Sequence, residues 1–463
     1  MKIKRLLIAN RGEIAVRIIS TAREMKIETV VVRNANEPDA MYVSLADIVF
    51  DNTEDPEEIP VFLNIGRLIE IAIETKCDAV HPGYGFLAEN AYFAQKCIEN
   101  KIIFIGPSPD AIYKMGNKTI ARELAMKQGI PMATGSRGNI GNEEEAAAAA
   151  ELIGYPVIIK AASGGGGRGM RIVRKPEELE KMFLIASKEA EKAFNDPSVF
   201  IEKYIENPKH IEFQILGDTK GNIVHLGERE CSIQRKHQKL LEEAPSSALD
   251  DDLRELMGSM AVRMARAVGY YSAGTVEFLL DSDRNFYFME MNTRLQVEHP
   301  VTEYVTGIDL VKEQLRVAAG EKLSFTQEDI KLTGHAIECR INAEDPDNNF
   351  MPSPGKIETW QMPGGPRVRL DSHGYAGYVI PPFYDSMLAK LIVHGKNRLD
   401  AIAIMLRALR EMQIGPVKCT ASLHEKILNN PKFRQGVITT KFIESAFGAG
   451  KQDGAEREKS SED

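Results

Sequence analysis

The stretch Lys160-Ala-Ala-Ser-Gly-Gly-Gly-Gly-Arg-Gly-Met170 decides the fold class, because it joins a short apolar strand to a loop of nearly bare backbone. Val157-Ile-Ile159 precedes the lysine and is typical of a buried strand that ends in a charge. Successive glycines let backbone N–H groups converge on an anion. The stretch therefore predicts a phosphate-binding lid, although glycine-rich segments also serve as plain solvent-exposed turns.

Two common nucleotide motifs fit the sequence poorly. No stretch matches G-x-x-x-x-G-K-[ST], so ordinary P-loop chemistry is not expected. The loop His81–Asn90 contains G-x-G-x-x-A at Gly83, Gly85 and Ala88, which matches the dinucleotide fingerprint. Because that fingerprint needs an acidic ribose partner about 20 residues further on, and no persuasive one follows, the match is weak. A non-catalytic nucleotide-binding module stays open as an alternative.

Length and composition limit the function classes. A chain of 463 residues is long enough for about two to four domains. The excess of 67 acidic over 58 basic residues gives a net charge of −9, which argues against nucleic-acid binding. No signal peptide and no apolar run of about 20 residues is found, so no membrane partner is expected. The five cysteines are widely spread and form no C-x-x-C pair, which indicates a reducing, cytoplasmic location without a zinc site.

The hydrophobic pattern predicts an α/β fold, α+β overall. In the first hundred residues, apolar strands alternate with helical stretches, which favours a Rossmann-like domain with a parallel sheet. The expected strands there are 6–9, 29–32, 79–81 and 102–105, and the expected helices are 13–26 and 60–75. Further on we expect helices at 143–153 and 253–269 and strands at 210–216, 223–227, 274–280 and 286–292. Proline and glycine clusters after residue 334 predict a final unit of short strands and turns.

The strand pair 274–280 and 286–292 carries the strongest metal signal. If Ser282–Asn285 forms a four-residue loop, Glu277 lies opposite Glu290, and Asn292 points to the same face. Like charges directly opposed destabilise a sheet. Two carboxylates and an amide oxygen would instead suit Mg²⁺ or Mn²⁺ that bridges nucleotide phosphates.

Other charged residues point to the same anionic ligand. Lys118 and Lys160 can supply point charges to the phosphates. Arg294 and Glu298, four residues apart beside the metal strand, could hold a small oxyanion and deprotonate it. The cationic run within Glu230–Lys239 is expected to line the same cleft.

Seven motifs, in order along the chain, make it resemble the biotin carboxylase family of ATP-grasp enzymes from about residue 3 to residue 445. They are Ala9–Ile14, His81–Asn90, Lys160–Met170, Glu228–Lys239, Phe288–Pro300, Glu338–Glu344 and Pro381–Ser386. The resemblance implies an N-terminal α/β domain (1–113), a two-lobed ATP-grasp domain (114–330) with a mobile lid lobe at about 132–204, a C-terminal biotin carboxylase domain (331–447) and a disordered tail (448–463).

Family roles transfer to the residues that match. The resemblance implies ATP contacts by Lys118, Lys160, Gly165, Gly166, Gly167, Glu202, Lys203, Tyr204, Ile205, His210, Gln234, His237, Glu277 and Glu290. It implies that Glu277, Glu290 and Asn292 hold two Mg²⁺ or Mn²⁺ ions, and that Lys239, Arg294, Gln296, Val297 and Glu298 bind bicarbonate. Arg340 would face biotin, and the catalytic residues would be Lys239, Arg294, Glu298 and Arg340.

The activity implied is that of a ligase that forms a C–N bond. ATP would convert bicarbonate to carboxyphosphate, with Glu298 as base, and the carboxyl group would pass to biotin while Arg340 stabilises the ureido oxyanion. Ala125-Met-Lys127 is interpreted as ordinary helix, so biotin is expected on a separate carrier protein.

The family also implies partners: a carboxyltransferase subunit, and a second copy in a homodimer. The parent complex, an acetyl-CoA, pyruvate or propionyl-CoA carboxylase, stays open. Another ATP-grasp ligase, similar to carbamoyl-phosphate synthetase, is the main alternative. It would share Lys160, Glu277 and Glu290, but it would not be expected to carry both Arg294–Glu298 and Glu338–Glu344.

Overall fold

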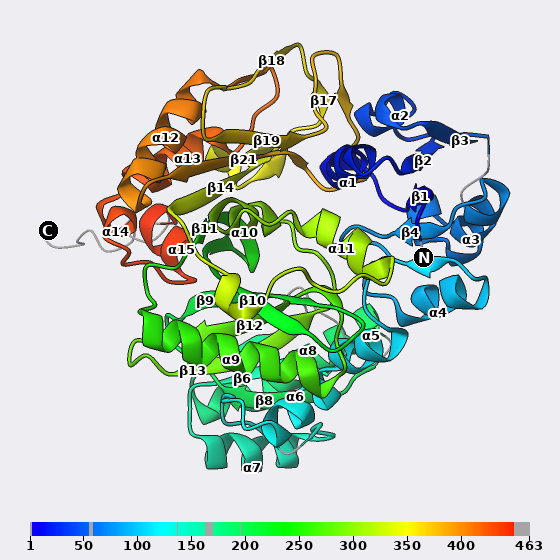
Figure 1. Ribbon diagram of the computed structural model, residues 1–463. Helices are drawn as coiled ribbons and strands as arrows, with labels where there is room; N and C mark the ends of the chain where they lie inside the picture. Colours follow the sequence, from blue (N-terminus) through cyan, green and yellow to red (C-terminus); the bar gives the residue numbers. More distant parts are fainter. Residues whose placement is uncertain (1, 55–58, 137, 163–169, 195, 449–463) are drawn as a thin grey trace, which may run out of the picture.

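A computed structural model describes residues 2–54, 59–136, 138–162, 170–194 and 196–448. The predicted lid glycines Gly165, Gly166 and Gly167, and all but the first residue of the predicted tail, lie outside this range. The described part combines a parallel sheet, a large antiparallel sheet and flanking helices (Figure 1), which confirms the mixed α/β class.

The N-terminal segment forms a five-stranded parallel sheet in the order β3-β2-β1-β4-β5. Its strands are β1 (Arg5–Ile8), β2 (Glu28–Asn34), β3 (Ile48–Asn52), β4 (Ala79–His81) and β5 (Ile103–Phe104). Its helices are α1 (Gly12–Glu24), α2 (Met41–Leu45), the 3-10 turn η1 (Val61–Leu63), α3 (Ile65–Glu74) and α4 (Ala91–Glu99). The four predicted strands are confirmed, β3 was not predicted, and the helix expected over 60–75 is divided where Asn64 caps α3 by accepting from the backbone N–H of Arg67.

Both faces of this sheet are covered. Leu6 and Ile8 of β1 pack into one core with α1, whereas Leu7 and Ala9 belong to another core with α3 and α4. Burial on both sides explains why these strands appear in the sequence as continuous apolar runs. In such doubly wound sheets, ligands bind where the strand order reverses. Here the reversal lies between β1 and β4, so the loops after these strands are expected to face a ligand.

An eight-stranded antiparallel sheet forms the centre of the molecule, in the order β13-β12-β9-β10-β11-β14-β21-β19. Its strands are β9 (Lys209–Gly217), β10 (Ile223–Arg235), β11 (Gln238–Ala244), β12 (Ser272–Leu280), β13 (Phe286–Asn292), β14 (His335–Asn342), β19 (Val368–Ser372) and β21 (Met387–Gly395). Strand β11 pairs with β14, for example Leu241 with Cys339. The sheet therefore crosses the boundary that we predicted between residues 330 and 331.

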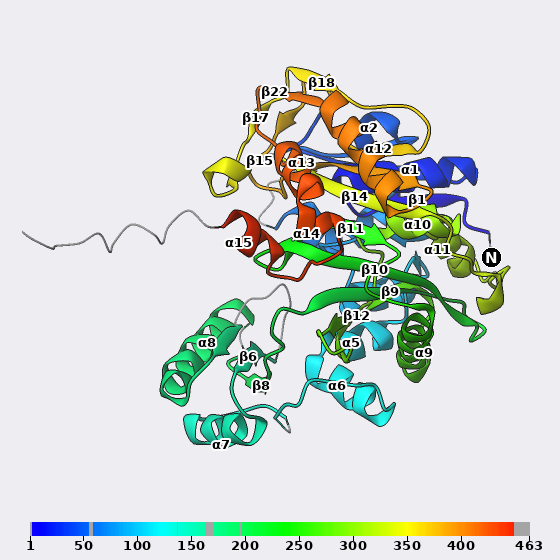
Figure 2. The same cartoon turned by 90° about the vertical axis from the view of Figure 1, so that its left-hand side faces the viewer.

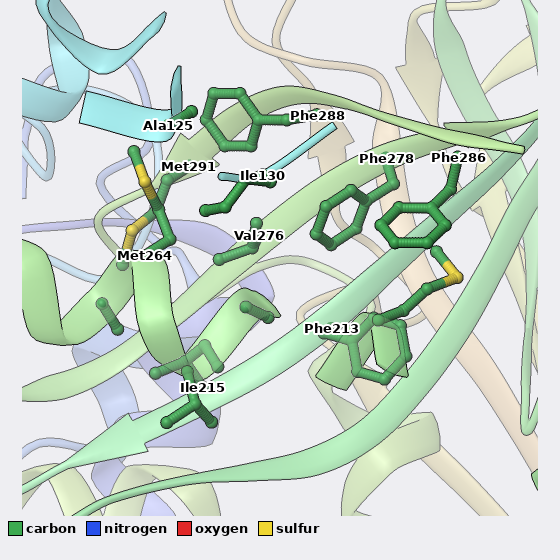
Figure 3. Close-up of a cluster of buried hydrophobic side chains, with 14 of the residues drawn as sticks. Ala125, Ile130, Phe213, Ile215, Met264, Val276, Phe278, Phe286, Phe288 and Met291 are labelled. Atoms are coloured by element: carbon green, nitrogen blue, oxygen red, sulfur yellow. The ribbon is translucent and has the colours of Figure 1, made fainter. Parts of the chain in front are cut away.

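An aromatic cluster fills the core on one face of this sheet (Figure 3). Phe278 of β12 is its centre and meets Phe213, Phe286 and Phe288 edge to face, with ring centroids 6.2, 5.6 and 6.4 Å away. Helix α9 (Asp251–Ala267) contributes to the same core. Because side chains alternate along a strand, burying Phe278 directs Glu277 to the opposite face.

The β12–β13 hairpin differs from the prediction in one respect. Five residues, Asp281–Asn285, connect the strands, because Leu280 pairs with Phe286. A bulge at Met289 then shifts the register, so that Glu277 pairs with Glu290 as predicted. Without the bulge, strict alternation would put Glu290 on the same face as Phe286 and Phe288. The bulge therefore brings the second carboxylate out of the core.

A smaller unit, at the bottom in Figure 2, contains the three-stranded sheet β7-β6-β8. Its strands are β6 (Val157–Ala161), β7 (Arg171–Val173) and β8 (Val199–Lys203), and helices α7 (Glu143–Ile153) and α8 (Leu179–Phe194) pack on one face. Val157 and Ile159 are buried in that core, so Ile158 and Lys160 point to the other face. The predicted helix 143–153 is confirmed to the residue.

The remaining elements complete the frame. They are α5 (Pro109–Gly116), α6 (Lys118–Lys127), η2 (Pro176–Glu178), α10 (His299–Thr306), α11 (Leu310–Ala318), η3 (Gln327–Asp329), β15 (Glu344–Asp345), η4 (Pro346–Asn348), β16 (Met351–Pro352), β17 (Gly355–Lys356), β18 (Thr359–Gln361), β20 (Val379–Ile380), α12 (Arg398–Glu411), β22 (Gln413–Gly415), α13 (Ala421–Asn429), α14 (Pro431–Arg434) and α15 (Phe442–Phe447). Ala125-Met-Lys127 ends α6, as predicted. Among the described helices, none is both long and apolar enough to cross a bilayer.

Candidate active site

A cleft of about 800 Å³ lies between the small unit, the large sheet and the N-terminal sheet. The loops after β1 and β4 line it, as the reversal of strand order predicted. Every predicted site residue that the structure describes also lines it. These residues are Lys118, Lys160, Glu202, Lys203, Tyr204, Ile205, His210, Gln234, His237, Lys239, Glu277, Glu290, Asn292, Arg294, Gln296, Val297, Glu298 and Arg340.

Two lysines bring positive charge to one end of the cleft. Lys118 is the first residue of α6, whose N-terminus is capped by Asn117. Lys160 comes from β6 and donates to Glu202 at 2.6 Å, while Arg122 pairs with the same carboxylate. Burial and the neighbouring cations Lys118 and Arg122 lower the pKa of Lys160. Lys160 and Arg122 thus share Glu202, and Glu290 is the carboxylate that acts on Lys118, so three cations face two carboxylates and positive charge remains for an anionic ligand.

The segment Lys203–Ile205 at the end of β8 and the β10–β11 turn also line the cleft. The backbone N–H groups of Lys203 and Tyr204 donate to Thr134 and Pro156, which ties β8 to the segments before β6. Arg235 pairs with Gln238, so Lys236 and His237 form a two-residue turn, and both have positive φ, 49° and 65°. Such a turn normally favours Asn or Gly. Backbone strain of this kind concentrates at functional positions.

Glu277 and Glu290 face each other across β12 and β13, with Asn292 on the same face. Burial opposes ionisation of Glu277, but Lys239 and His210 outweigh it and hold its pKa below the ordinary value. Burial and the charge of Glu277 raise the pKa of Glu290. Two opposed carboxylates, Glu277 buried and Glu290 half-buried, beside an amide oxygen fit a divalent cation, because its charge would relieve their repulsion.

The Glu277 carboxylate also has partners within the protein. His210 Nε2 is 3.0 Å from one oxygen, and the other accepts from Lys239, Asn292 and Gln296 at 3.1, 3.1 and 2.8 Å. The ligand-capable atoms of His210, Glu212 and Glu277 all lie within 4.8 Å of one another. Groups of the protein itself therefore hold the Glu277 carboxylate in place.

Glu298 lies between two cations. One of its oxygens accepts from Lys239 at 2.5 Å and the other from Arg340 at 2.8 Å. Burial opposes ionisation, but Lys239, Arg340 and Arg229 hold the pKa of Glu298 well below its ordinary value. Arg340 also donates to Glu242 at 2.6 Å. Glu298 is thus an ionised carboxylate inside a mostly buried charge cluster.

Two neighbours of Glu298 are held by residues that the sequence did not single out. Arg294 donates to Glu89 at 3.0 Å and to the Asn292 side-chain oxygen at 2.9 Å. Gln296 accepts from Arg229 at 2.7 Å, and Arg229 is fully buried. Sequence reasoning missed Glu89 and Arg229, although both lie inside quoted motifs. A charged residue within a motif was the only signal available.

Several further lining residues were also missed. Arg122, Glu13, Tyr84, Phe86 and Tyr384 contact the cleft and were assigned no role. Glu212, beneath the cleft, accepts from both Arg229 and Lys239 at 2.5 Å. Their partners are tens or hundreds of residues away, so spacing along the chain could not identify them.

The dinucleotide interpretation of the His81–Asn90 loop gains no support from the structure. In that motif the glycine loop opens directly into a helix. Here α4 begins at Ala91 and is capped by Asn90. The side chain of Asn10 donates to the carbonyls of Pro82 and Tyr84, which ties this loop to the loop after β1.

Comparisons with known proteins cover nearly the whole chain. The biotin carboxylase N-terminal domain matches residues 2–112, the ATP-binding domain of the carbamoyl-phosphate synthase L chain matches residues 117–326, and the biotin carboxylase C-terminal domain matches residues 338–445.

Individual relatives are similar over nearly their full length. The chain is 55% identical to a biotin carboxylase from Nostoc sp., over 96% of this chain and 99% of that protein. It is 50% identical to the small subunit of 2-oxoglutarate carboxylase from Hydrogenobacter thermophilus, over 95% and 93%. Among solved structures, the biotin carboxylase domain dimer of that Hydrogenobacter enzyme, in complex with MgADP, ADP and bicarbonate, has 49% identity and a TM-score of 0.93, over 96% and 98%.

Proposed function

Because the chain belongs to the biotin carboxylase family of ATP-grasp enzymes, we propose that it activates bicarbonate with ATP and carboxylates biotin on a separate carrier protein. The observation that carries the proposal is the position of Glu298 between Lys239 and Arg340. These residues lie in the cleft that also contains Lys118, Lys160 and the paired carboxylates. The proposed base, anion site and nucleotide site thus line one cleft.

We propose that the nucleotide phosphates bind at Lys118 and Lys160. Glu277, Glu290 and Asn292 would hold two Mg²⁺ or Mn²⁺ ions, which when bound neutralise charge on the transferred phosphoryl group. Lys118 and Arg122 lie near Lys160 and lower its pKa, so an anionic phosphate bound there reduces the repulsion between these cations. The adenine would bind beside Lys203, Tyr204 and Ile205, with contacts from Glu202, His210, Gln234 and His237. Gly165, Gly166 and Gly167 would cover the phosphates.

Bicarbonate would bind at Lys239, Arg294, Gln296 and the Val297 backbone, next to Glu298. Its negative charge competes with Glu298 for Lys239. When Lys239 shifts to the substrate, the pKa of Glu298 rises from its depressed value, and the carboxylate becomes a stronger base. Glu298 then takes the bicarbonate proton as the substrate oxygen attacks the γ-phosphorus of ATP. The products of this step are carboxyphosphate and ADP.

The second half of the reaction concerns biotin. Its ureido nitrogen is a very weak acid, so loss of the proton requires stabilisation of the enolate-like oxygen. Arg340 can supply this, because it lines the cleft, where Glu242 accepts from its Nε and Glu298 from its Nη2. By family analogy, phosphate released from carboxyphosphate accepts the ureido proton. The carboxyl carbon then bonds to the deprotonated nitrogen.

Release of ADP tests this function. The purified chain is supplied with ATP and Mg²⁺, and bicarbonate and free biotin are omitted in turn. The proposal expects release to be fastest with both present, and equal rates without them would contradict it. Stimulation by ammonium in place of biotin would favour a ligase of the carbamoyl-phosphate type, although that family matches only residues 117–326.

Partners form part of the proposal. Relatives include one component of a pyruvate carboxylase and the small subunit of 2-oxoglutarate carboxylase, which supports a multi-subunit carboxylase as the setting. We expect a biotin carrier protein, a carboxyltransferase and a second copy of this chain as partners. The acceptor is then identified by the carboxyltransferase that co-purifies. We also expect a reducing cytoplasmic compartment, because all five cysteines are free.

A further inference from the structure

Lys390 of β21 has a fully buried side chain and does not line the cleft. Its ammonium nitrogen is 3.3 Å from Glu13 and 3.9 Å from Asp371. It also donates a hydrogen bond of 2.9 Å to the backbone oxygen of Val297. A lysine is almost never fully buried unless it is paired. The neutralising partners explain how Lys390 is tolerated, and the bond to Val297 indicates what it does.

The sheet directs Lys390 towards the bicarbonate loop, residues 294–298. Lys390 pairs with Arg340 in the register of β14 and β21, so the two cations lie side by side on one face. Arg340 reaches the Glu298 side chain, whereas Lys390 reaches the backbone one residue earlier. One sheet face therefore contacts the loop at two successive residues.

Several residues hold side chains of this loop: Glu89 holds Arg294, Arg229 holds Gln296, and Lys239 holds Glu298. The carbonyls of Gln296 and Glu298 accept from the backbone N–H groups of His299 and Val301. The carbonyl between them, that of Val297, accepts from Lys390. The carbonyl of Val297 belongs to the same planar peptide group as the N–H of Glu298. Fixing that carbonyl therefore fixes the backbone from which the Glu298 carboxylate extends.

We propose that Lys390 is a positioning residue that orients the Val297–Glu298 peptide, and so presets the bicarbonate site before substrate binds. This inference rests on the proposed function of the cleft. It also connects three parts of the chain, because Glu13 belongs to α1, Val297 to the loop before α10, and Lys390 to β21. A loop displacement of about 1 Å can cost about a hundredfold in rate.

The test compares Lys390→Met with the wild-type protein in bicarbonate-dependent ADP release. We expect the KM for bicarbonate to rise by about tenfold or more, while the KM for ATP changes less than about twofold. Lys390→Arg keeps the charge and should recover part of the bicarbonate affinity. An unchanged KM for bicarbonate in folded Lys390→Met would overturn the proposal.

Arg398→Met is the matched control. Arg398 also pairs with a buried carboxylate, Glu243 at 2.6 Å, and donates to a backbone carbonyl, that of Arg434 at 3.0 Å, but it neither lines the cleft nor bonds to residues 294–298. The Arg398→Met substitution should lower the melting temperature without changing the KM for bicarbonate. An equal KM rise in this control would also overturn the proposal, because the effect would then reflect stability alone.

Lys390→Met leaves Glu13 buried without its cation and can prevent folding. The double variant with Glu13→Gln removes that charge, and Glu13→Gln alone is its reference. The raised KM should persist in the double variant relative to this reference, and its absence would refute the role of Lys390. If ADP release by the wild-type chain does not depend on bicarbonate, the proposed function itself is refuted. That result differs from a bicarbonate-dependent wild type with an unchanged KM in the Lys390 variants, which refutes only the role of Lys390.

Discussion

Replacing Glu298 by Gln tests the proposed base directly. Glutamine keeps the size of the side chain but cannot accept the bicarbonate proton. General base catalysis contributes about 10²- to 10⁴-fold, so turnover should fall by that factor, or about 3–5 kcal/mol in activation free energy. The stability cost should be smaller. Lys239 keeps Glu212 at 2.5 Å, and Arg340 keeps Glu242 at 2.6 Å, so neither cation loses its only carboxylate.

We therefore expect Glu298→Gln to lose about 1–2 kcal/mol of unfolding free energy, below the usual cost of breaking a buried ion pair. The assay is ADP release at saturating ATP, with bicarbonate and free biotin, together with the KM for ATP and urea unfolding. Glu243→Gln is the control, because Glu243 is also buried between two basic side chains, His335 at 2.9 Å and Arg398 at 2.6 Å. It should lose stability and keep its rate. A Glu298→Gln rate within about tenfold of wild type would refute the reasoning.

Three further predictions concern other parts of the structure. Arg340→Ala should reduce biotin carboxylation by about 10²- to 10³-fold and biotin-independent ATP hydrolysis much less, and equal losses would assign Arg340 to the first half-reaction. Glu290→Gln removes one of the two opposed carboxylates, so Mn²⁺ affinity in an EPR titration should fall by about 10- to 100-fold, and unchanged affinity would contradict the proposed ligand. Burial opposes ionisation of Glu243, but His335 and Arg398 lower its pKa from 4.5 to about 2. The ionised Glu243 therefore stabilises the folded protein fully above pH 4.5, and this contribution is lost as the pH falls towards 2. The gap in unfolding free energy between wild type and Glu243→Gln should therefore be about 3 kcal/mol at pH 7 and shrink as the pH falls from about 4.5 to about 2, and a constant gap would count against the ion pairs.

Local patterns were sufficient for most of the framework. Alternation and turn residues predicted the strand pair that carries Glu277 and Glu290, and the alanine-rich helix 143–153 was correct at both ends. The bulge at Met289 was not predicted, because no residue type or spacing in this stretch indicates that one strand carries an extra residue. The errors in loop length and bulge cancel, which is why the pairing of the two carboxylates was nevertheless right.

The supporting residues of the site could not be predicted in the same way. Arg229 and Lys390 hold Gln296 and Val297, which lie 67 and 93 residues away along the chain. Such contacts depend on how sheets and loops pack, and nothing in local periodicity encodes them. The β3 strand Ile48–Asn52 was missed for a related reason, since it is only partly buried and its identity depends on pairing with β2.

The pairing of β11 with β14 limits how the polypeptide can be divided. A fragment that stops at residue 330 would leave Leu241–Ala244 as a bare strand edge, and unpaired edges recruit other chains and aggregate. It would also lack Arg340 and Lys390. A chimaera of two relatives should therefore have its junctions in surface loops, so that all eight strands of the antiparallel sheet come from the same parent protein.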